Sequence, residues 1–407
     1  MFLRVGLSSI SLSLVFWMSA SAVQAQQFER PPAYNTAKLL GARAAGPNYT
    51  IDSPTVSDGY LNVYQIRVKK GRYRVEGDEL LRNRLYELQV LQKLDQMSQG
   101  GQLVEGVGTA VVAPVKYAGR VVTAPVKTVG QTISGVGSFF GRMASGIGNV
   151  GSSPEGTVSS VLGVSGAKRE LAKKFGVDPY TDFKPLASRM SDLAGASAIG
   201  QLTVKVPLSL ASGGAATAIS GVSTLSSVRS MIYEKTASQV RDINRSKLQA
   251  MGVDGKTINR LLNNKRYTVT DRAVMIGALE QLRGVGGRAL FVARAAQAKS
   301  RGIAFFQRKR AEHLASYHQT KGQLRSFISL AGFPLTQTRS GRVLALFPLD
   351  SFTWTKKNAR IITAITEDIR RKNLGTSPEF RTTGWATPLA EKMLKSQGWR
   401  VSHVYGS

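Results

Sequence analysis

The spacing of apolar residues changes from strand-like to helical near residue 78. Between residues 49 and 75, β-branched and aromatic residues occupy alternate positions and Gly-containing pairs separate the runs, which predicts strands joined by turns. The runs are Tyr49-Thr50-Ile51, residues 60–68 and Tyr73-Arg74-Val75. From Leu80 to Leu94, leucines recur mainly at spacings of three and four, which predicts an amphipathic helix. We therefore expect a small antiparallel β meander plus helix over residues 49–101, after an extended lead-in over residues 26–48.

An 11-residue repeat is the most regular pattern in the chain. Between Gly106 and Asn149, four units read GVGTAVVAPVK, YAGRVVTAPVK, TVGQTISGVGS and FFGRMASGIGN. Eleven residues make almost three helical turns, so one face recurs with a drift of about 20° per unit. Apolar residues fall on one face and basic or small polar residues on the other, with no acidic residue between Glu105 and Glu155. The pattern over residues 102–150 predicts a basic amphipathic helix that lies on a membrane surface or against a partner.

Eight residues of this repeat are our candidates for contact with an anionic surface. The basic side chains would meet headgroups, and the apolar side chains would enter the acyl boundary. They are Lys116, Arg120, Lys127, Arg142, Val122, Val126, Ile133 and Phe140. Glycines and prolines make the segment unstable as a helix in water, so it needs an apolar boundary. That boundary is either a membrane or the protein's own helices.

Residues 151–325 are expected to form a basic helical domain, and residues 326–407 a small C-terminal α/β unit. Helical spacing in the first region predicts helices over residues 158–175, 248–262 with a turn at Gly252, 273–283 and 288–319. In the second region the pattern predicts strands over residues 342–347 and 399–404, and helices over residues 359–372 and 387–396. The predicted fold class is therefore α+β, mostly helical.

One stretch inside the helical region is unusually poor in charge. From Leu193 to Val228 the only charged residue is Lys205. Pro207, the pair Gly213-Gly214 and many hydroxyl side chains lower its hydrophobicity below that of a normal membrane span. Three interpretations stay open: a buried pair of small-residue helices, a membrane-inserting hairpin, and a glycine-rich loop.

The first 25 residues indicate export. Arg4 precedes a short apolar stretch, and Val23-Gln24-Ala25 offers small residues at a cleavage site, which is typical of a secretory signal peptide. The mature chain is expected to begin at Gln26. An uncleaved N-terminal anchor is the alternative. The chain contains no Cys, which excludes disulfides, thiol catalysis and a lipidated N-terminal cysteine.

The charge balance indicates an anionic partner. Lys and Arg number 55 against 25 Asp and Glu, a formal net charge of +30. Outside the cytoplasm the abundant anions are acidic lipid headgroups, lipopolysaccharide, wall polymers and released nucleic acid. The excess can also serve solubility alone.

Motifs for cofactors or catalysis are weak. Residues 250–257 match the spacing of a phosphate-binding loop, but a helix precedes them where a strand is required, so we interpret Gly252 as a helix stop and Asp254 as a helix cap. Residues 146–151 and 284–289 match dinucleotide-loop spacing without a preceding strand, and we interpret both as flexible joints. His313 and His318 fall on different helix faces, which argues against zinc. No cofactor, metal or catalytic residue is predicted.

Two further patterns could carry function. Residues 305–310 combine adjacent phenylalanines with three basic residues, a composition suited to stacking and phosphate contact with nucleic acid. The alternative is that the phenylalanines anchor a core and the charges are solvated. The carboxylate pairs Asp78-Glu79 and Glu367-Asp368 are interpreted as solvated rather than catalytic.

Several segments resemble an uncharacterised family of exported bacterial proteins of unknown function. The resemblance lies in Gly59-Tyr60-Leu61, Leu80-Leu81-Arg82-Asn83-Arg84, residues 175–180, residues 264–268 and residues 390–399. It implies export and a co-linear arrangement over most of the mature chain, and it implies no activity.

The sequence therefore predicts an exported, periplasmic or secreted protein without enzymatic activity. It would associate with anionic lipid or envelope polymer through the basic amphipathic repeat and the basic helical region. The first alternative is a membrane-inserting, toxin-like or pore-forming protein that uses residues 193–228. The second is a secreted nucleic-acid-binding protein.

Overall fold

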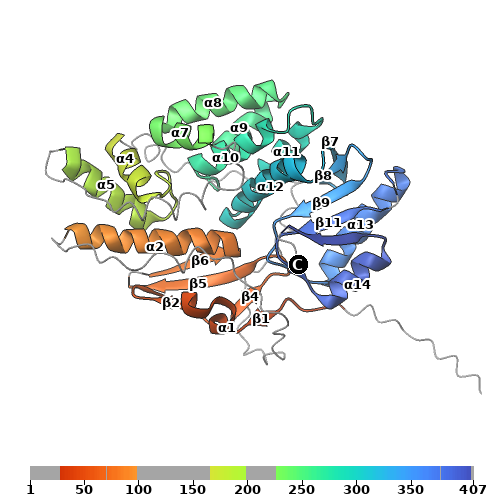
Figure 1. The fold of residues 1–407 in the computed structure, drawn as a ribbon, viewed down its shortest axis with the longest axis horizontal. Coiled ribbons are helices and arrows are strands. Elements are labelled where there is room, and N and C mark those ends of the chain that lie inside the picture. The colour runs from red at the N-terminus through yellow and green to blue at the C-terminus, as the bar shows by residue number, and fades with distance from the viewer. Residues whose placement is uncertain (1–27, 70, 99–165, 199–225, 376, 405–407) are drawn as a thin grey trace, which may run out of the picture.

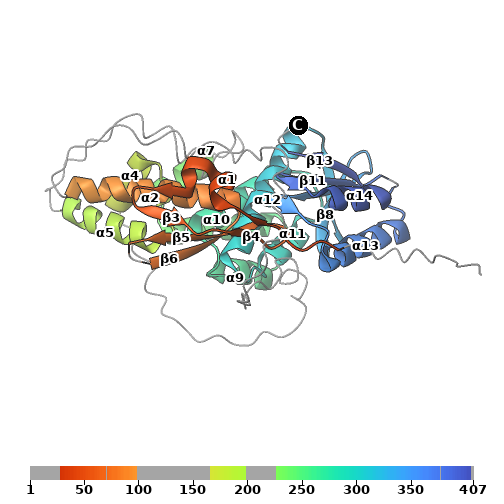
Figure 2. The same ribbon diagram turned by 90° about the horizontal axis from the view of Figure 1, so that it is seen from below.

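The computed structural model describes residues 28–69, 71–98, 166–198, 226–375 and 377–404. In this part of the chain the fold is α+β and mostly helical, with an antiparallel N-terminal sheet and a second sheet near the C-terminus, which confirms the predicted fold class. Helix α12 crosses the middle of the molecule between the two sheets (Figure 1). In the view from below, the N-terminal sheet lies on the left and the C-terminal sheet on the right (Figure 2).

The predicted meander forms an antiparallel N-terminal sheet. Its strands are β1 (Ala33–Tyr34), β2 (Ala45–Gly46), β3 (Tyr49–Ile51), β4 (Thr55–Ser57), β5 (Asn62–Val68) and β6 (Gly71–Glu76). Strand β5 is central, because it pairs with β6 along one edge and with β3 and β4 along the other. Alternate β5 side chains, including Tyr64 and Ile66, are buried, as the period-two pattern predicts.

We expected residues 26–48 to be extended, but the described part of this lead-in contains helical turns and short strands. Helix α1 (Thr36–Leu40), a short 3-10 helix (Gly41–Ala44) and strands β1 and β2 form within it. The Thr36 hydroxyl bonds to the Asp52 carbonyl at 2.9 Å, and Leu40 is buried in the core. Asn35 caps α1 by accepting a hydrogen bond from Lys38 N. Tertiary contacts and this cap stabilise a helix too short to be recognised by periodicity.

The central region is a layered set of helices. They are α2 (Asp78–Ser98), α4 (Gly166–Phe175), α5 (Lys184–Ala198), α7 (Ser226–Glu234), α8 (Ala237–Ala250), α9 (Gly255–Asn263), α10 (Val269–Glu280), α11 (Arg288–Ala295) and α12 (Arg301–Thr320). Helix α2 lies along the N-terminal sheet, with the other helices on its far side (Figure 1). Helix α10 is buried almost all round: Val274 belongs to the hydrophobic cluster of the N-terminal half, and Ile276 and Leu279 to that of the C-terminal half.

Local stop signals fall where the sequence places them. Gly252 has φ +75°, a conformation that glycine adopts without a steric cost, and it ends α8. The Asp254 side chain accepts a hydrogen bond from Thr257 N at 2.9 Å and caps α9. The phosphate-loop pattern at residues 250–257 is therefore a helix–turn–helix connection, as predicted.

The helix predicted over residues 288–319 is broken into α11 and α12. Ser300 caps α12 by accepting a hydrogen bond from Ile303 N, and α11 packs against the C-terminal sheet. Residues 284–289 are also not a flexible joint, because Gly286 exchanges backbone hydrogen bonds with Arg325 and Phe327 of that sheet. A Cβ at Gly287 would lie 2.6 Å from the Phe327 carbonyl oxygen. This close backbone approach fixes the position where α11 begins.

The C-terminal unit is a five-stranded mixed sheet in the order β13-β11-β9-β8-β7. Its elements are β7 (Leu324–Leu330), β8 (Phe333–Thr338), β9 (Val343–Phe347), α13 (Lys356–Arg371), β11 (Glu379–Thr382), α14 (Pro388–Ser396) and β13 (Arg400–His403), with β10 (Ser351–Phe352) paired to β12 (Trp385–Ala386). Strands β7 to β9 are antiparallel, and β9, β11 and β13 are parallel through crossover helices α13 and α14. The predicted elements near residues 342–347, 359–372, 387–396 and 399–404 are confirmed.

The segment poor in charge is described only at its ends. Residues 199–225 lie outside the described residues, whereas Leu193, Ala194 and Val228 are buried in the hydrophobic core. None of the described helices combines the length and apolar character needed to cross a membrane. The three interpretations of residues 193–228 therefore stay open.

Candidate functional site: a buried charged pocket

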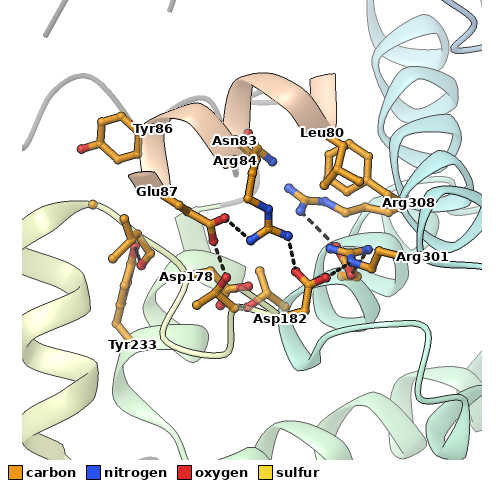
Figure 3. Close-up of a pocket in the computed structure, with 16 residues that line it drawn as sticks. Leu80, Asn83, Arg84, Tyr86, Glu87, Asp178, Asp182, Tyr233, Arg301 and Arg308 are labelled. Carbon is orange, nitrogen blue, oxygen red and sulfur yellow. Dashed lines mark hydrogen bonds and ion pairs between the residues drawn. The ribbon is translucent and has the colours of Figure 1, made fainter. Parts of the chain in front are cut away.

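A small charged pocket lies where α2, the turn at residues 176–182, α10 and α12 meet. Its volume is about 40 Å³, enough for roughly two or three water molecules at about 15 Å³ each. Arg84, Arg301 and Arg308 line it together with four carboxylates, Glu87, Asp178, Asp182 and Asp271. Figure 3 shows Arg84 between Glu87 and Asp182, with Arg301 reaching Asp182 from the opposite side.

Helix α2 supplies one side of the pocket. Arg84 and Glu87 are three residues apart and therefore lie on the same helix face. The Arg84 guanidinium is 2.6 Å from a Glu87 oxygen and 3.0 Å from an Asp182 oxygen. The Arg84 Cζ atom also lies 4.5 Å from the centre of the Phe183 ring. These contacts hold the turn against α2.

Helix α12 supplies the other side. Arg301 lies 2.9 Å from Asp182 and 2.8 Å from Asp271, so it joins the turn to α10. About two turns further along the same face of α12, Arg308 pairs with Asp271 at 3.3 Å and with Glu312 at 2.8 Å. The carboxylate of Asp271 thus sits between two arginines.

The same network extends beyond the pocket and returns to α2. Lys309 Nζ is 2.8 Å from Glu312 and 3.1 Å from Glu79, which lies at the start of α2. Ion pairs therefore connect Glu87 to Glu79 through the turn, α10 and α12. Buried pairs of this kind are sensitive to the loss of one partner, because the other charge is left uncompensated.

Asp178 is the pocket carboxylate that can exchange a proton near neutral pH. Burial raises the pKa of Asp178 to about 7, and the nearby Asp271 and Glu87 carboxylates add to this shift. Its Oδ1 atom accepts hydrogen bonds from Tyr180 N at 2.8 Å and Thr270 Oγ1 at 2.5 Å, which oppose the shift. Burial also raises the pKa of Glu87, although Arg84 opposes it.

Asp182 behaves in the opposite way. Although burial alone would raise it, Arg301 and Arg84 hold the pKa of Asp182 down at about 2. The pocket therefore combines one firmly ionised carboxylate with one that titrates near pH 7. Its volume suits water or a small ion rather than a substrate of several atoms.

The eight residues predicted to contact an anionic surface all belong to residues 102–150, outside the described part of the chain. Lys116, Arg120, Lys127, Arg142, Val122, Val126, Ile133 and Phe140 are therefore not placed relative to the pocket. Among the described residues no group of three or more acidic or histidine side chains could hold a metal ion.

Residues 305–310 do not form an exposed nucleic-acid surface. Phe305 and Phe306 are buried in the core, as the alternative interpretation has it, but Arg308, Lys309 and Arg310 are buried too. The expectation that these charges are solvated is wrong, because carboxylates from α2, α10 and α12 compensate the first two.

The carboxylate pair at the start of α2 is also not solvated. Asp78 is 7% exposed, and its Oδ1 atom accepts hydrogen bonds from the Tyr64 hydroxyl at 2.6 Å and the Asn62 amide at 2.9 Å. Asp350, from the C-terminal unit, is buried beside it and accepts hydrogen bonds from the backbone N–H groups of Asn62 and Asp78. Burial, with the charge of Asp78, raises the pKa of Asp350 well above its usual range.

The two histidines of α12 have separate surroundings, as their spacing predicts. His313 Nε2 lies 3.7 Å from Glu79, and His318 Nδ1 accepts a hydrogen bond from Leu324 N at 2.9 Å. Burial, with repulsion from Arg339, lowers the pKa of His318.

Sequence reasoning missed the pocket because its partners are far apart in the chain. Arg308 and Glu312 carry a recognisable signal, a spacing of four on one helix. The pairs of Arg301 with Asp182 and of Lys309 with Glu79 have no local signal.

Comparison with protein-family models, with characterised proteins and with solved structures found no match to this chain.

Proposed function

We propose that this is an exported, non-enzymatic protein that associates with anionic surfaces of the cell envelope. The observation that carries the proposal is the excess of cations on the surface: within the described residues only five Lys and Arg side chains are buried, against seven of the much less numerous Asp and Glu side chains. A surface with a large excess of cations attracts anionic partners.

The interior holds a large share of the carboxylates. The buried ones include Asp58, Asp78, Asp271, Glu312, Asp350, Asp368 and Glu379. Within the described residues the exposed carboxylates are Asp95, Glu170, Asp182, Asp192, Glu234, Asp242, Asp254 and Glu367, and Asp182 is already paired with two arginines.

Basic side chains gather on α8, α9 and the loop that follows. We define the α8–α9 basic surface as Arg241, Arg245, Lys256, Arg260, Lys265 and Arg266. Arg241 donates to the Leu262 carbonyl at 2.7 Å, and Arg245 donates to the Asn259 side chain at 2.9 Å. These bonds hold α8 against α9 and keep the charges on one structural unit.

The loop after α9 displays Lys265 and Arg266 on an anchored backbone. The Asn264 side-chain amide donates to the Ala296 and Ala298 carbonyls at 3.1 and 2.9 Å, and the Tyr267 hydroxyl donates to the Ala295 carbonyl at 2.8 Å. Both anchors point into the protein, so the two exposed cations between them are held in position before a partner arrives. Preorganisation of this kind reduces the entropy lost on binding.

Electrostatic attraction determines how strongly the protein is expected to bind an acidic surface. Each Lys or Arg near an acidic membrane contributes about 1 kcal/mol, and salt weakens the attraction over roughly a Debye length of 10 Å at 0.1 M. The repeat at residues 102–150 is part of this proposal: its valine and phenylalanine stripe would add burial of apolar surface at about 25 cal/mol per Å².

Sedimentation with vesicles tests the proposal. The mature protein is expected to bind vesicles containing phosphatidylglycerol and to bind neutral vesicles at least tenfold less. Replacing Lys256, Arg260, Lys265 and Arg266 together by Gln should weaken binding at least about tenfold, since even half of the possible 4 kcal/mol exceeds 1.4 kcal/mol. Replacing four exposed lysines elsewhere, Lys173, Lys174, Lys184 and Lys235, is the charge-matched control and should have a smaller effect.

Further measurements separate the alternatives. Val122→Asp with Val126→Asp should reduce vesicle binding if the repeat inserts, and should instead lower the denaturant midpoint if the repeat packs on the protein. Release of trapped dye would favour the pore-forming alternative. DNA can also be added as a competitor for vesicle binding at increasing salt concentrations. If the protein still binds DNA at salt concentrations that abolish vesicle binding, a nucleic-acid binder is favoured. No binding of the mature protein to acidic vesicles would overturn the proposal.

A further inference from the structure

Arg310 is a fully buried cation with no carboxylate partner among the described residues. Its exposed fraction is 0%, and it lies in α12 directly after Arg308 and Lys309, which both have carboxylate partners. Its Nε atom donates to the Leu346 carbonyl at 3.0 Å, and its Nη2 atom donates to the Pro334 carbonyl. The rings of Phe347 and Phe291 flank the guanidinium, with centroids 4.8 and 5.6 Å from Cζ.

One nitrogen of this guanidinium remains unused. Nη1 of Arg310 is buried and has no hydrogen-bond partner in the part of the chain that the structure describes. Arg294 of α11 is half-buried, and its Nε atom is likewise buried without a partner. Both groups reach the same part of the structure: Arg310 lies against Phe291, three residues before Arg294 in α11, and donates to Pro334, the neighbour of the Phe333 that Arg294 overlies. Burial, with repulsion from Arg294, lowers the pKa of Arg310 to about 9.

Two guanidinium groups in this arrangement leave positive charge uncompensated. An arginine remains protonated under ordinary conditions, and burial of an unpaired ion costs several kcal/mol. The two flanking rings offset only part of this cost, and the carbonyl oxygens carry only partial charge. The described surroundings thus lack a counter-anion, in contrast to those of Arg308 and Lys309, which directly precede Arg310 in α12.

We propose that Arg294 and Arg310 form a binding site for a phosphate group, which can belong to free phosphate or to a lipid headgroup. A phosphate dianion matches the charge of two guanidinium groups, and its oxygens match the planar fork of N–H donors. Because Arg310 has no exposed surface, a phosphate can reach it only after a side chain moves. The half-buried Arg294 side chain, whose Cζ atom lies 5.3 Å from the centre of the Phe333 ring, is the one that we infer swings away.

The mouth of the site carries an apolar neighbour. Leu290 lies one turn before Arg294 on the same face of α11 and is 42% exposed, unusual for a large hydrophobic side chain in this structure. A phosphate that carries an acyl chain would bury this leucine, whereas free phosphate would not. The site is distinct from the α8–α9 basic surface, so it does not depend on the vesicle-binding proposal.

Titration of the mature protein with inorganic phosphate at constant ionic strength, adjusted with chloride, tests the site. Phosphate should raise the melting temperature saturably and give a calorimetric binding curve. Arg294→Gln should weaken phosphate affinity at least about tenfold, the equivalent of one charge-assisted hydrogen bond, and Arg294→Lys should recover part of it. Arg325→Gln, an exposed arginine on β7, is the matched control and should leave the affinity unchanged.

Labelling of arginine with ¹⁵N adds a direct readout of Arg310, because phosphate should shift the resonance of its buried guanidinium in the wild-type chain. The source of the phosphate follows from a second titration with a short-chain phosphatidic acid. If the protein binds phosphatidic acid more tightly than inorganic phosphate, and Leu290→Ser removes this difference, the phosphate group belongs to a lipid headgroup. If the affinities for the two ligands are equal, the site binds free phosphate. Absence of a saturable phosphate effect, or equal losses in Arg294→Gln and Arg325→Gln, would overturn the inference.

Discussion

Asp271→Asn tests whether the buried ion-pair network stabilises the junction of the two halves. Asp271 is 1% exposed, its Oδ2 atom lies 2.8 Å from Arg301 and its Oδ1 atom 3.3 Å from Arg308. Its side chain also accepts a hydrogen bond from Thr268 N at 2.9 Å in the capping box of α10. Asparagine has the same shape and can keep the cap through its carbonyl oxygen, so the substitution removes mainly the charge.

The expected loss follows from the remaining partners. Removing one partner of a buried ion pair costs about 3–5 kcal/mol, because the other charge is left uncompensated. Arg301 keeps Asp182, and Arg308 keeps Glu312. The lower end of the range therefore applies, and we expect the free energy of unfolding to fall by about 3 kcal/mol.

Urea denaturation of the protein, followed by circular dichroism, measures this loss from the transition midpoint at an unchanged slope. Glu367→Gln, the same chemical change at an exposed position of α13, is the control and should stay within about 0.5 kcal/mol of wild type. A loss below about 1 kcal/mol for Asp271→Asn would show that the network contributes little to stability and would refute the reasoning.

Two further substitutions test other parts of the structure. In the folded protein the pKa of Asp178 is raised from 3.8 to about 7. Between these pH values Asp178 therefore binds more protons in the folded state than in the unfolded state, so its contribution to stability falls as the pH rises from about 4 to 7. Asp178→Asn should therefore gain in urea midpoint relative to wild type from pH 4 to pH 7, and a pH-independent difference would contradict the shift. Gly384→Ala should destabilise the fold by about 1–3 kcal/mol, because the new methyl group would overlap the Asp350 carbonyl oxygen. The control is Gly255→Ala, which has no atom within 4 Å of the new carbon and should be neutral or slightly stabilising. Thermal denaturation measures both.

Local physical chemistry determined much of the secondary structure. The strand Asn62–Val68, the stop at Gly252 and the cap at Asp254 follow from alternation, a positive φ and a side-chain acceptor, all of which act within a few residues. Helix α14 likewise starts after Thr387, which accepts a hydrogen bond from Ala390 N and is followed by proline at the first helical position. Signals of this range can be read from the sequence alone.

Only the tertiary structure decided where the charges lie. The sequence places basic and acidic residues on helix surfaces, where solvation is the ordinary outcome, yet Arg308, Lys309 and Glu312 are buried because partners from distant segments converge on them. Arg310, next in the chain, is buried beside two aromatic rings and no carboxylate. Burial of an ion depends on which opposite charges reach it, and that is set by the packing of α2, α10, α12 and the C-terminal sheet rather than by any local pattern.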